Sequence, residues 1–404
     1  MPHTTRGHRL TLCMALLGLA LMSGCRSEAP ANTPTNAKLT RTGSQPSVEE
    51  VARGFEHPWA LAFLPDGRML VSERGGRLWL LSADGQQRQP VRGLPPVVAR
   101  GQGGLLDVSV APTSVVPGAD SWVYWTYSEP GTGAEARLQG TAVARGRLVG
   151  DELLDVQVVY RQVPKTSGHG HYGSRLVWGR DGHLFVTLGD RQRDDPSRPG
   201  REHAQNLGTT LGKVVRLRAD GTVPADNPRW PTPGARPEVY SLGHRNAQGA
   251  ALHPDTGELW LTEHGPQGGD ELNRVLPGRN HGWPLVSAGC PYGSPEVHTC
   301  QVNGGHHEPD FEPPLSVWAP YSTAPSGLAF NTAKRYPGWE GHLFSGSLSG
   351  ETLWRIELKD HQVVARQPLL ERKVGRIRDV RMGPDGWLYL VTDEEDGRIL
   401  RLVR

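Results

Sequence analysis

Short apolar runs recur in pairs along this chain, and a Gly or Asp-Gly turn separates the two members of most pairs. Each pair has the pattern of a β-hairpin. Six pairs are present, at Leu61–Leu70, Leu106–Val123, Leu176–Phe185, Ala250–Trp260, Leu328–Phe344 and Val380–Tyr389. Hairpins repeated at long, uneven intervals are typical of a β-propeller, in which each hairpin forms part of one blade. The pattern therefore predicts an all-β, six-bladed β-propeller.

The composition agrees with this prediction. The 404 residues include 51 Gly and 34 Pro, which suits a fold with many tight turns, and no sustained 3.6-residue apolar period indicates long helices. The formal net charge is +2, and no basic stripe is visible along the chain. Nucleic acid is therefore not an expected partner.

The N-terminal residues follow a different pattern. Arg6, His8 and Arg9 precede the apolar stretch Leu10–Met22, which is too short to span a bilayer as a mature helix. The stretch ends in the letters LMSGC, which resemble a bacterial lipoprotein signal whose cysteine, here Cys25, receives the lipid. An ordinary secretion signal with a chance cysteine is the alternative. Both interpretations predict export.

We therefore expect three regions. Residues 1–24 form the expected signal peptide, residues 25–47 a flexible tether rich in Pro, Thr, Ala, Ser and Asn, and residues 48–404 the propeller domain. The expected location is the periplasm or the cell envelope, with membrane contact through the lipid anchor alone.

Two cysteines remain once Cys13 and Cys25 are assigned to the signal and the lipid. Cys290 and Cys300 stand ten residues apart in a loop rich in Gly and Pro. In an exported protein such a pair most simply forms a disulfide that closes the loop. A metal site is the alternative, because three histidines stand nearby, at His298, His306 and His307.

A histidine and an aspartate flank one of the expected hairpins. His171 follows a Gly-rich loop just before an inner strand, and Asp190 stands at the end of the following strand. A carboxylate in that position can fix the tautomer of the imidazole and raise its basicity, which is what a general base needs. A surface histidine near a structural aspartate is the alternative.

Other polar side chains stand at the ends of expected strands. Arg245 and Asn246 offer a guanidinium fork and an amide to the oxygens of a ligand, and Gln102 offers a second amide. Arg376 and Arg378 are two residues apart at the start of a strand, so both side chains point to the same face. On the channel face they form an anion clamp, and on the outer face they are ordinary surface charge.

An irregular acidic segment follows the fourth hairpin. Gly265-Pro266 cannot continue a strand regularly, so its carbonyl groups are free. Free carbonyls beside Asp270 and Glu271 are hard oxygen ligands of the kind that calcium takes. A plain acidic loop is the alternative.

Six motifs occur in a fixed order along the chain: QGGLL, HYGSRLVWGRDGHLFVTLGDR, GHRNAQG, EHGPQGGDELN, NHGWP and RIRDVRMGPDG. In this order the chain resembles the glucose/sorbosone dehydrogenase family, which contains the soluble aldose sugar dehydrogenases that depend on pyrroloquinoline quinone (PQQ). The resemblance covers Val48 to Arg404. The family fold is a six-bladed propeller, which agrees with the count of hairpins.

The resemblance implies an activity and the roles of three residues. It makes His171 the base that removes the hydroxyl proton at the anomeric carbon of an aldose, with Asp190 as its partner. The hydride passes to PQQ, and Arg245 together with calcium stabilises the developing negative charge. The product is the lactone, and an electron acceptor that the sequence does not name takes up the electrons.

The resemblance also implies the ligand sites. The residues expected to hold PQQ are Gln102, Arg245, Asn246, Tyr292, Ser347, Leu348, Ser349, Arg376, Ile377 and Arg378. The residues expected at calcium are Gly265, Pro266, Glu271 and His281.

The chain departs from the family pattern at three positions. Ser349 stands where the family usually has a lysine that contacts PQQ, and His281 stands where tyrosine is common. Gly170 replaces the acid that precedes the catalytic histidine in the glucose-specific members, which favours the broader aldose dehydrogenase branch. Two other functions stay open: a calcium-dependent lactonase propeller and a non-catalytic propeller that binds a partner.

Overall fold

The computed structural model describes residues 37–41, 45–116, 121–297 and 299–404. The expected signal peptide, Cys25 and His298 lie outside the described residues. Within these ranges the chain forms 25 strands and three 3-10 helices, at Gly133–Glu135, His203–Gln205 and Asn303–Gly305. No helix among the described residues is long and apolar enough to span a membrane. The all-β prediction is confirmed.

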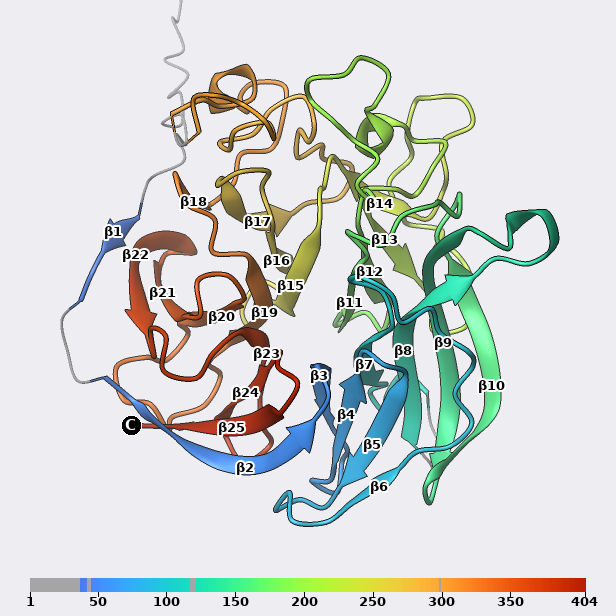
Figure 1. Cartoon of the computed structure of the whole chain (residues 1–404), viewed down its shortest axis with the longest axis vertical. Coiled ribbons are helices and arrows are strands. Elements are labelled where there is room, and N and C mark those ends of the chain that lie inside the picture. Colours follow the sequence, from blue (N-terminus) through green and yellow to red (C-terminus); the bar gives the residue numbers. More distant parts are fainter. Residues whose placement is uncertain (1–36, 42–44, 117–120, 298) are drawn as a thin grey trace, which may run out of the picture. The chain divides into compact units, whose positions relative to one another are not determined.

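The strands form six sheets around a common centre (Figure 1). The first three blades, from the innermost strand outward, are β3 (Pro58–Phe63), β4 (Met69–Glu73), β5 (Arg77–Leu81) and β6 (Arg88–Pro90); β7 (Leu105–Val110), β8 (Ser121–Pro130), β9 (Gln139–Val149) and β10 (Glu152–Arg161); and β11 (Gly173–Trp178), β12 (Leu184–Leu188), β13 (Lys213–Leu217) and β14 (Val239–Leu242).

The other three blades follow the same order. They are β15 (Ala247–Leu252), β16 (Leu259–Glu263), β17 (Asp270–Val275) and β18 (Ser316–Trp318); β19 (Pro325–Phe330), β20 (Leu343–Ser347), β21 (Leu353–Lys359) and β22 (Gln362–Leu369), with β1 (Lys38–Leu39) at the edge; and β23 (Ile377–Met382), β24 (Leu388–Thr392), β25 (Gly397–Val403) and β2 (Ser47–Phe55). The six-bladed propeller is confirmed, and each hairpin expected from the sequence corresponds to the two innermost strands of one blade.

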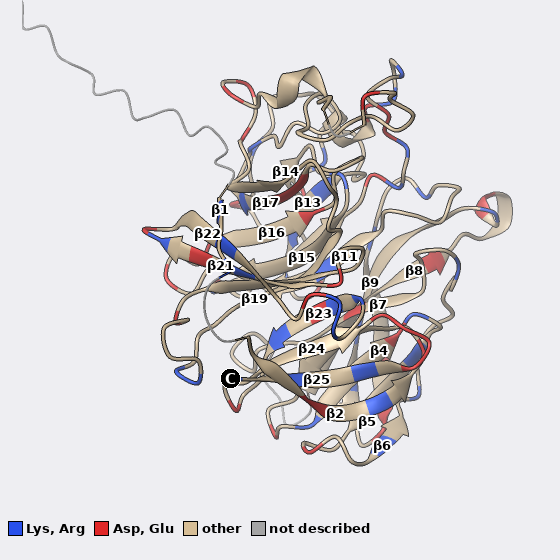
Figure 2. Cartoon of the chain, turned by 60° about the vertical axis from the view of Figure 1, so that its left-hand side comes forward, with Lys and Arg blue, Asp and Glu red and all other residues tan. Residues whose placement is uncertain are grey.

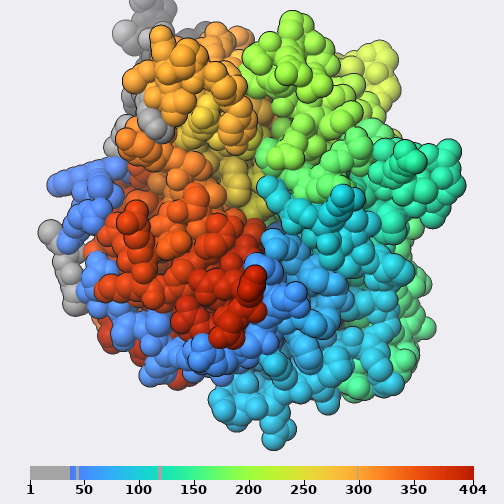
Figure 3. All heavy atoms as spheres, in the orientation of Figure 1, coloured from blue at the N-terminus to red at the C-terminus, as the bar shows by residue number. Residues whose placement is uncertain are grey.

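Two N-terminal strands complete blades that are formed by the C-terminal part of the chain. β2 pairs antiparallel with β25, and the register runs from Ser47 opposite Val403 to Phe55 opposite Gly397. The pairing closes the ring, and the blue atoms of β2 lie beside the red C-terminal atoms in Figure 3. β1 pairs parallel with β22. Lys38 and Leu39, which lie in the segment expected to be a tether, are therefore part of a sheet.

Aromatic and aliphatic side chains fill the spaces between neighbouring sheets. Trp260 of β16 is fully buried and packs with Phe330 of β19, with a ring-centroid separation of 5.5 Å. Trp125 of β8 is buried in the cluster that joins the first two blades. This interdigitated packing, together with the closure by β2, holds the six inner strands in a fixed arrangement.

Buried charges connect the inner strands at the centre of the ring. Arg175 of β11 lies 3.3 Å from Asp107 of β7 and 3.0 Å from Asp379 of β23. Arg381 contacts the same two carboxylates at 2.7 and 2.8 Å. The central acids are therefore balanced by two arginines, and the network fixes the inner strands beneath the candidate site. Along the rest of the ribbon, basic and acidic residues are interspersed over the strands and loops (Figure 2).

Candidate active site

Many of the residues expected at the site stand at corresponding ends of the inner strands, because of how a propeller is built. Gly173 of β11 pairs with Leu188 of β12, so the segment before an inner strand and the segment after its neighbour lie at the same end of the blade. His171 stands before β11, and Asp190 stands after β12. The other candidates occupy equivalent positions around the ring: Gln102, Arg245, Asn246, Ser347, Leu348, Ser349 and Arg376.

His171 and Asp190 form a buried pair. His171 Nδ1 lies 2.7 Å from Asp190 Oδ1, and the relative exposures of the two residues are 6% and 1%. Trp283 Nε1 donates to Asp190 Oδ2 at 2.9 Å. Because the carboxylate accepts a hydrogen bond from Nδ1, the proton of the neutral ring is on Nδ1 and the lone pair is on Nε2. This is the tautomer that a general base requires.

The surroundings keep the ring neutral and the carboxylate charged. Burial, reinforced by the positive charge of Arg245, lowers the pKa of His171, and Asp190 only partly offsets this. Burial acts to raise the pKa of Asp190, but His171, Arg245 and the N–H of Gln192 outweigh it, so the pKa is lowered. The pair is therefore a neutral base beside an ionised partner.

Arg245 is held between two aromatic rings. Its guanidinium lies 5.1 Å from the ring centroid of Trp283 and 5.7 Å from that of Tyr292. Its Nη1 donates to the carbonyl of His264 at 3.1 Å, whereas its buried Nε has no partner among the described residues. A cation held in this way, with one donor unused, is suited to a ligand oxygen.

These groups line one pocket of about 220 Å³. Its walls come from the segments that precede β11 and β15, from the segment after β12, and from the segments between β16 and β17 and between β17 and β18. The lining residues are His171, Gln192, Asp194, Asp195, Pro196, Arg201, Arg245, Pro266, Trp283 and Tyr292. The volume is sufficient for a small organic molecule next to the histidine.

Gln102 and Asn246 shape the site from its edge. Gln102 Oε1 accepts the backbone N–H of His171 at 2.7 Å, which helps to hold His171 at its positive φ of 49°. Asn246 Oδ1 accepts the backbone N–H of Gly173 at 3.1 Å. Both amides therefore orient the loop that carries His171.

Arg376 and Arg378 face the same carboxylate. Arg378 is buried and contacts Asp393 and Gln248, whereas Arg376 is 43% exposed and lies 3.5 Å from Asp393. Burial acts to raise the pKa of Asp393, but Arg378, Arg74 and Arg376 outweigh it and lower the pKa. Three arginines near one aspartate leave a surplus of positive charge. That surplus, together with Arg378 Nε, which is buried without a partner, fits a ligand with several carboxylates.

The remaining residues expected at PQQ, on segments 347–349 and 376–378, differ in how exposed they are. Ser347 is buried and its hydroxyl donates to the carbonyl of Thr323 at 2.7 Å, and Leu348 and Ile377 are also buried. Ser349 is exposed, and its hydroxyl lies 3.4 Å from the carbonyl of Ser322. The neutral hydroxyl of Ser349 is thus the side chain of this segment that is available to a ligand.

The expected calcium residues divide between two places. Pro266 lines the larger pocket beside Arg245. Gly265, Glu271 and His281 line a separate cavity of about 10 Å³, which has the size of one water or one ion. Burial and the charge of Glu263 raise the pKa of Glu271 to about 8. The carbonyls of Gly265 and Pro266 suit calcium, whereas the ring nitrogens of His281 do not.

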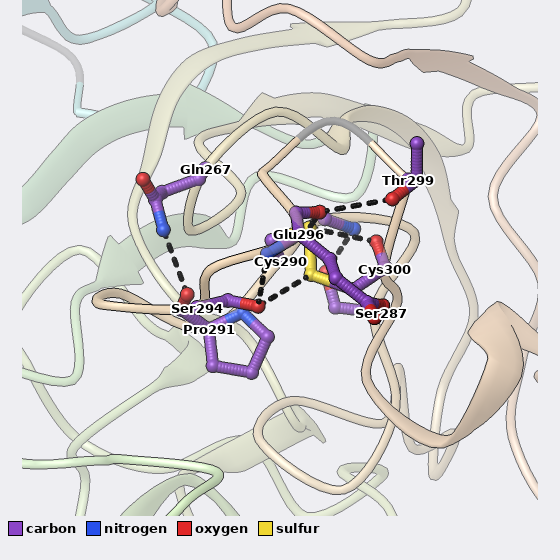
Figure 4. Close-up of a disulfide and its surroundings, with 9 residues drawn as sticks. Gln267, Ser287, Cys290, Pro291, Ser294, Glu296, Thr299 and Cys300 are labelled. Carbon is purple, nitrogen blue, oxygen red and sulfur yellow. Dashed lines mark hydrogen bonds between the residues drawn. A yellow bond between two sulfur atoms is a disulfide. The ribbon is translucent and has the colours of Figure 1, made fainter.

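The expected disulfide between Cys290 and Cys300 is present (Figure 4). The backbone of Cys290 pairs with that of Gln267 through hydrogen bonds of 3.0 and 3.1 Å, and Gln267 Nε2 donates to the carbonyl of Pro291 at 2.7 Å. The bridged loop is therefore attached to the segment that carries Pro266, and it supplies Tyr292 to the pocket.

Sequence reasoning did not assign roles to Trp283, Gln192 or Asp393. Trp283 lies within the NHGWP motif, but nothing in the motif indicates a hydrogen bond to Asp190, 93 residues away. Gln192 is two residues after Asp190, and its N–H donates to that carboxylate at 2.8 Å. Asp393 directly follows β24, as Asp190 closely follows β12, and an acid just after the second strand of a blade is the signal that could have identified it.

A sequence profile described as "Glucose / Sorbosone dehydrogenase" matches residues 55–401 of the chain. The chain belongs to the glucose/sorbosone dehydrogenase family. It is 41% identical to the aldose sugar dehydrogenase YliI of Escherichia coli over 360 residues, which cover 88% of this chain and 92% of the relative. The family membership makes the protein an oxidoreductase.

Solved structures agree with this assignment to the glucose/sorbosone dehydrogenase family. A structure described as glucose dehydrogenase superposes with a TM-score of 0.80 and 45% identity, over 88% of this chain and 99% of that chain. The PQQ-bound aldose sugar dehydrogenase of Streptomyces coelicolor superposes with a TM-score of 0.70 and 30% identity, over 92% of this chain and 99% of that chain.

Proposed function

We propose that the protein is an exported quinoprotein that oxidises aldose sugars at C1 to the corresponding lactone, with PQQ and calcium as cofactors. The observation that carries the proposal is the buried His171–Asp190 pair, which faces a pocket that also contains Arg245. Bound PQQ supplies the acceptor for the hydride that leaves C1. The roles below belong to the chain's own residues.

His171 removes the proton. Its Nε2 lone pair accepts the hydrogen of the C1 hydroxyl, so that the C1–O bond gains double-bond character as the hydride leaves. Asp190 stabilises the positive charge that then forms on the imidazole, and Trp283 keeps the carboxylate in position. Arg245 is placed to stabilise negative charge on an oxygen in the pocket.

The cofactor is held at the positive side of the site. Arg376, Arg378, Arg245 and Tyr292 would hold PQQ, with the arginines binding its carboxylates, and Gln102 and Asn246 keep the loop that carries His171 in place. The segment from Ser347 to Ser349 contributes a hydroxyl where the family has a lysine. The carbonyls of Gly265 and Pro266 would hold the calcium ion.

Cofactor-dependent dehydrogenase activity tests the proposal. The purified protein is assayed with an artificial electron-acceptor dye over a panel of aldoses, with and without PQQ plus calcium. We expect dye reduction only when the sugar, PQQ and calcium are all present. Sugar-independent dye reduction, or lactone hydrolysis without PQQ, contradicts the proposal, and the latter supports a lactonase.

The export proposal has a separate test. Replacement of Cys25 by Ala removes the only thiol placed to receive a lipid at the end of the signal. We expect Cys25→Ala to be found in the soluble fraction and the wild-type protein in the membrane fraction. Equal sedimentation of both proteins with membranes contradicts lipid anchoring.

A further inference from the structure

The backbone that carries Trp283 is held by a side chain from another blade. Trp283 lies in the segment between β17 and β18, outside any strand or helix. Its N–H donates to the carbonyl of Gly243 at 3.0 Å, and its own carbonyl accepts a hydrogen bond of 2.7 Å from Gln205 Nε2. Among the described residues, Gln205 is the only donor to that carbonyl. Gln205 therefore holds in place the residue whose indole contacts both Asp190 and Arg245.

The amides of Gln205 and Asn280 form a reciprocal pair of hydrogen bonds. Asn280 Nδ2 donates to Gln205 Oε1 at 2.7 Å, and Gln205 Nε2 donates to Asn280 Oδ1 at 3.1 Å. The backbone N–H of Gly282 also donates to Asn280 Oδ1, at 3.0 Å, so this oxygen is an acceptor and Gln205 Nε2 is the donor that faces it. Gly243 leaves room for the pair, because a Cβ there would lie 2.3 Å from Asn280 Oδ1. The amide of Gln205 is thus fixed in the orientation that the carbonyl of Trp283 requires.

Gln205 ends a 3-10 helix of a single turn that begins at His203. A turn this short does not hold its own shape, and two charged side chains hold it instead. Asp194 accepts the backbone N–H groups of His203 and Ala204 at 2.6 and 2.7 Å. Lys213 Nζ donates to the carbonyls of the same two residues at 3.0 and 2.9 Å. The turn is therefore bound on its N–H side and on its carbonyl side.

The burial of Lys213 shows that this attachment is specific. Its side chain is 0% exposed, which is rare for a lysine because burying an ammonium group costs free energy. Its third N–H donates to the carbonyl of Leu211 at 2.7 Å, so all three donors have acceptors. On the other side of the turn, Asp194 lines the same pocket as His171. The turn thus connects the wall of the pocket with the segment that carries Trp283.

We propose that Gln205 is a positioning residue for the sugar oxidation. Its amide holds the backbone of Trp283, and the indole of Trp283 holds the carboxylate of Asp190. Asp190 in turn keeps the ring of His171 in the tautomer that leaves Nε2 free. Gln205 does not line the pocket, so it acts through Trp283. Its effect on turnover rests on the proposed function, whereas its effect on Trp283 does not.

Hydrogen exchange of indole N–H groups tests the inference in the purified full-length protein, before PQQ or sugar is added. The bond to Asp190 protects the Trp283 indole, and the Trp354 indole of β21, which donates to Thr323 Oγ1 at 2.9 Å, is the internal reference. NMR spectra of isotope-labelled protein give both rates, with Trp283→Phe and Trp354→Phe for assignment. We expect Gln205→Glu, which lacks the amide donor, to accelerate exchange at Trp283 at least about fivefold and to leave Trp354 unchanged.

Two further variants separate the loss of the Gln205 amide from general damage to the turn. Glu202→Ala removes an exposed side chain that makes no capping hydrogen bond to the same turn, and it should leave both rates unchanged. Gln205→Ala removes the whole amide and should match Gln205→Glu, because the lost donor rather than the new charge is responsible. An unchanged Trp283 rate in both Gln205 variants, or equal acceleration at Trp283 and Trp354, overturns the inference.

Steady-state kinetics supplies the second readout. With PQQ and calcium added, Gln205→Ala should lower kcat about tenfold and change the KM for the sugar less than about twofold, because the base is displaced while the lining of the pocket is kept. Full turnover in this variant overturns the positioning role, even if exchange at Trp283 is faster. A wild-type protein without dehydrogenase activity contradicts the proposed function instead, and the exchange rates still decide whether Gln205 holds Trp283.

Discussion

Trp283 donates a hydrogen bond of 2.9 Å to the Asp190 oxygen that His171 does not use. Asp190 therefore has a donor on each oxygen, and neither oxygen is free to turn away from the imidazole. The same indole ring lies against the guanidinium of Arg245. One side chain from the segment between β17 and β18 thus positions both the proposed base and the proposed oxyanion partner.

The pH dependence of the reaction follows from the state of His171. Its pKa is lowered from the ordinary value of 6.5, because burial and Arg245 disfavour the charged ring. A base works only when neutral, so activity is lost as the pH falls through this pKa. We expect the acid limb of a kcat/KM profile to lie below pH 6.5. An acid limb above that value assigns the base to another group.

Removal of the base is expected to affect turnover more than cofactor binding. His171→Ala should lower kcat by about 10²–10⁴-fold, the usual contribution of a positioned general base, with PQQ affinity retained. His169→Ala, on the same loop, is the matched control and should keep full activity. Equal losses in the two variants would indicate damage to the loop rather than loss of a base.

Arg245→Ala is expected to lower turnover by about 10²–10³-fold through loss of charge stabilisation. Because Arg245 also contacts the cofactor pocket, PQQ affinity should fall in this variant, unlike in His171→Ala. Steady-state kinetics combined with a PQQ titration separates the two effects. Unchanged turnover at saturating PQQ would remove Arg245 from the chemical step.

The disulfide is expected to support the cofactor pocket through Tyr292. Replacement of Cys290 and Cys300 by Ser should lower the melting temperature, since a bridge of this kind typically contributes about 2–4 kcal/mol. PQQ affinity should fall as well. Tyr292→Phe, which keeps the ring and the bridge, is the control. A lower melting temperature with unchanged PQQ affinity would separate the bridge from the pocket.

Gly170 is expected to influence sugar preference through Gln192. A Cβ at Gly170 would lie 2.3 Å from Cδ and Oε1 of Gln192, so Gly170→Asp must displace that exposed amide. We expect a change of about 2- to 10-fold in relative kcat/KM among aldoses, the size of one hydrogen bond, with little change in stability. Gln192→Ala should give a similar shift, and identical profiles for all three proteins would contradict this role.

Ser349→Lys is expected to tighten PQQ binding by about tenfold, because a charged hydrogen bond replaces a neutral one. The exposure of Ser349 leaves room for the longer side chain. Isothermal calorimetry measures the change, and Ser349→Met controls for side-chain length. Unchanged or weaker binding would show that this segment is not in contact with PQQ or that another cation already occupies the place.

The six hairpins were predictable because each is specified by residues that are close together in the sequence. Each consists of a turn and two apolar runs, and a propeller uses these as its two innermost strands. Closure by β2 was not predictable, since Ser47 pairs with Val403 and neither carries a signal of the other. β2 is also largely exposed, so its sequence lacks the alternation that marks a half-buried strand.

The candidate site was likewise predictable only in part. His171 and Asp190 flank one hairpin, and their pairing followed from the register of neighbouring strands. The contact between Glu271 and His307 did not follow, because a segment without regular structure brings the histidine back to β17. The sequence linked His307 to the two cysteines only through the alternative of a metal site, and the cysteines form the disulfide that was expected.

The pairing of β2 with β25 also has a consequence for biosynthesis. The first long strand of the propeller finds its partner only after residues 397–403 have left the ribosome, so the ring cannot close before that point. Until then β2 and β24 each have an unpaired edge, which is a template for association with other chains. A nascent chain kept unfolded until residues 397–403 have emerged avoids that hazard, because β2 and β24 then both meet β25 as the ring closes.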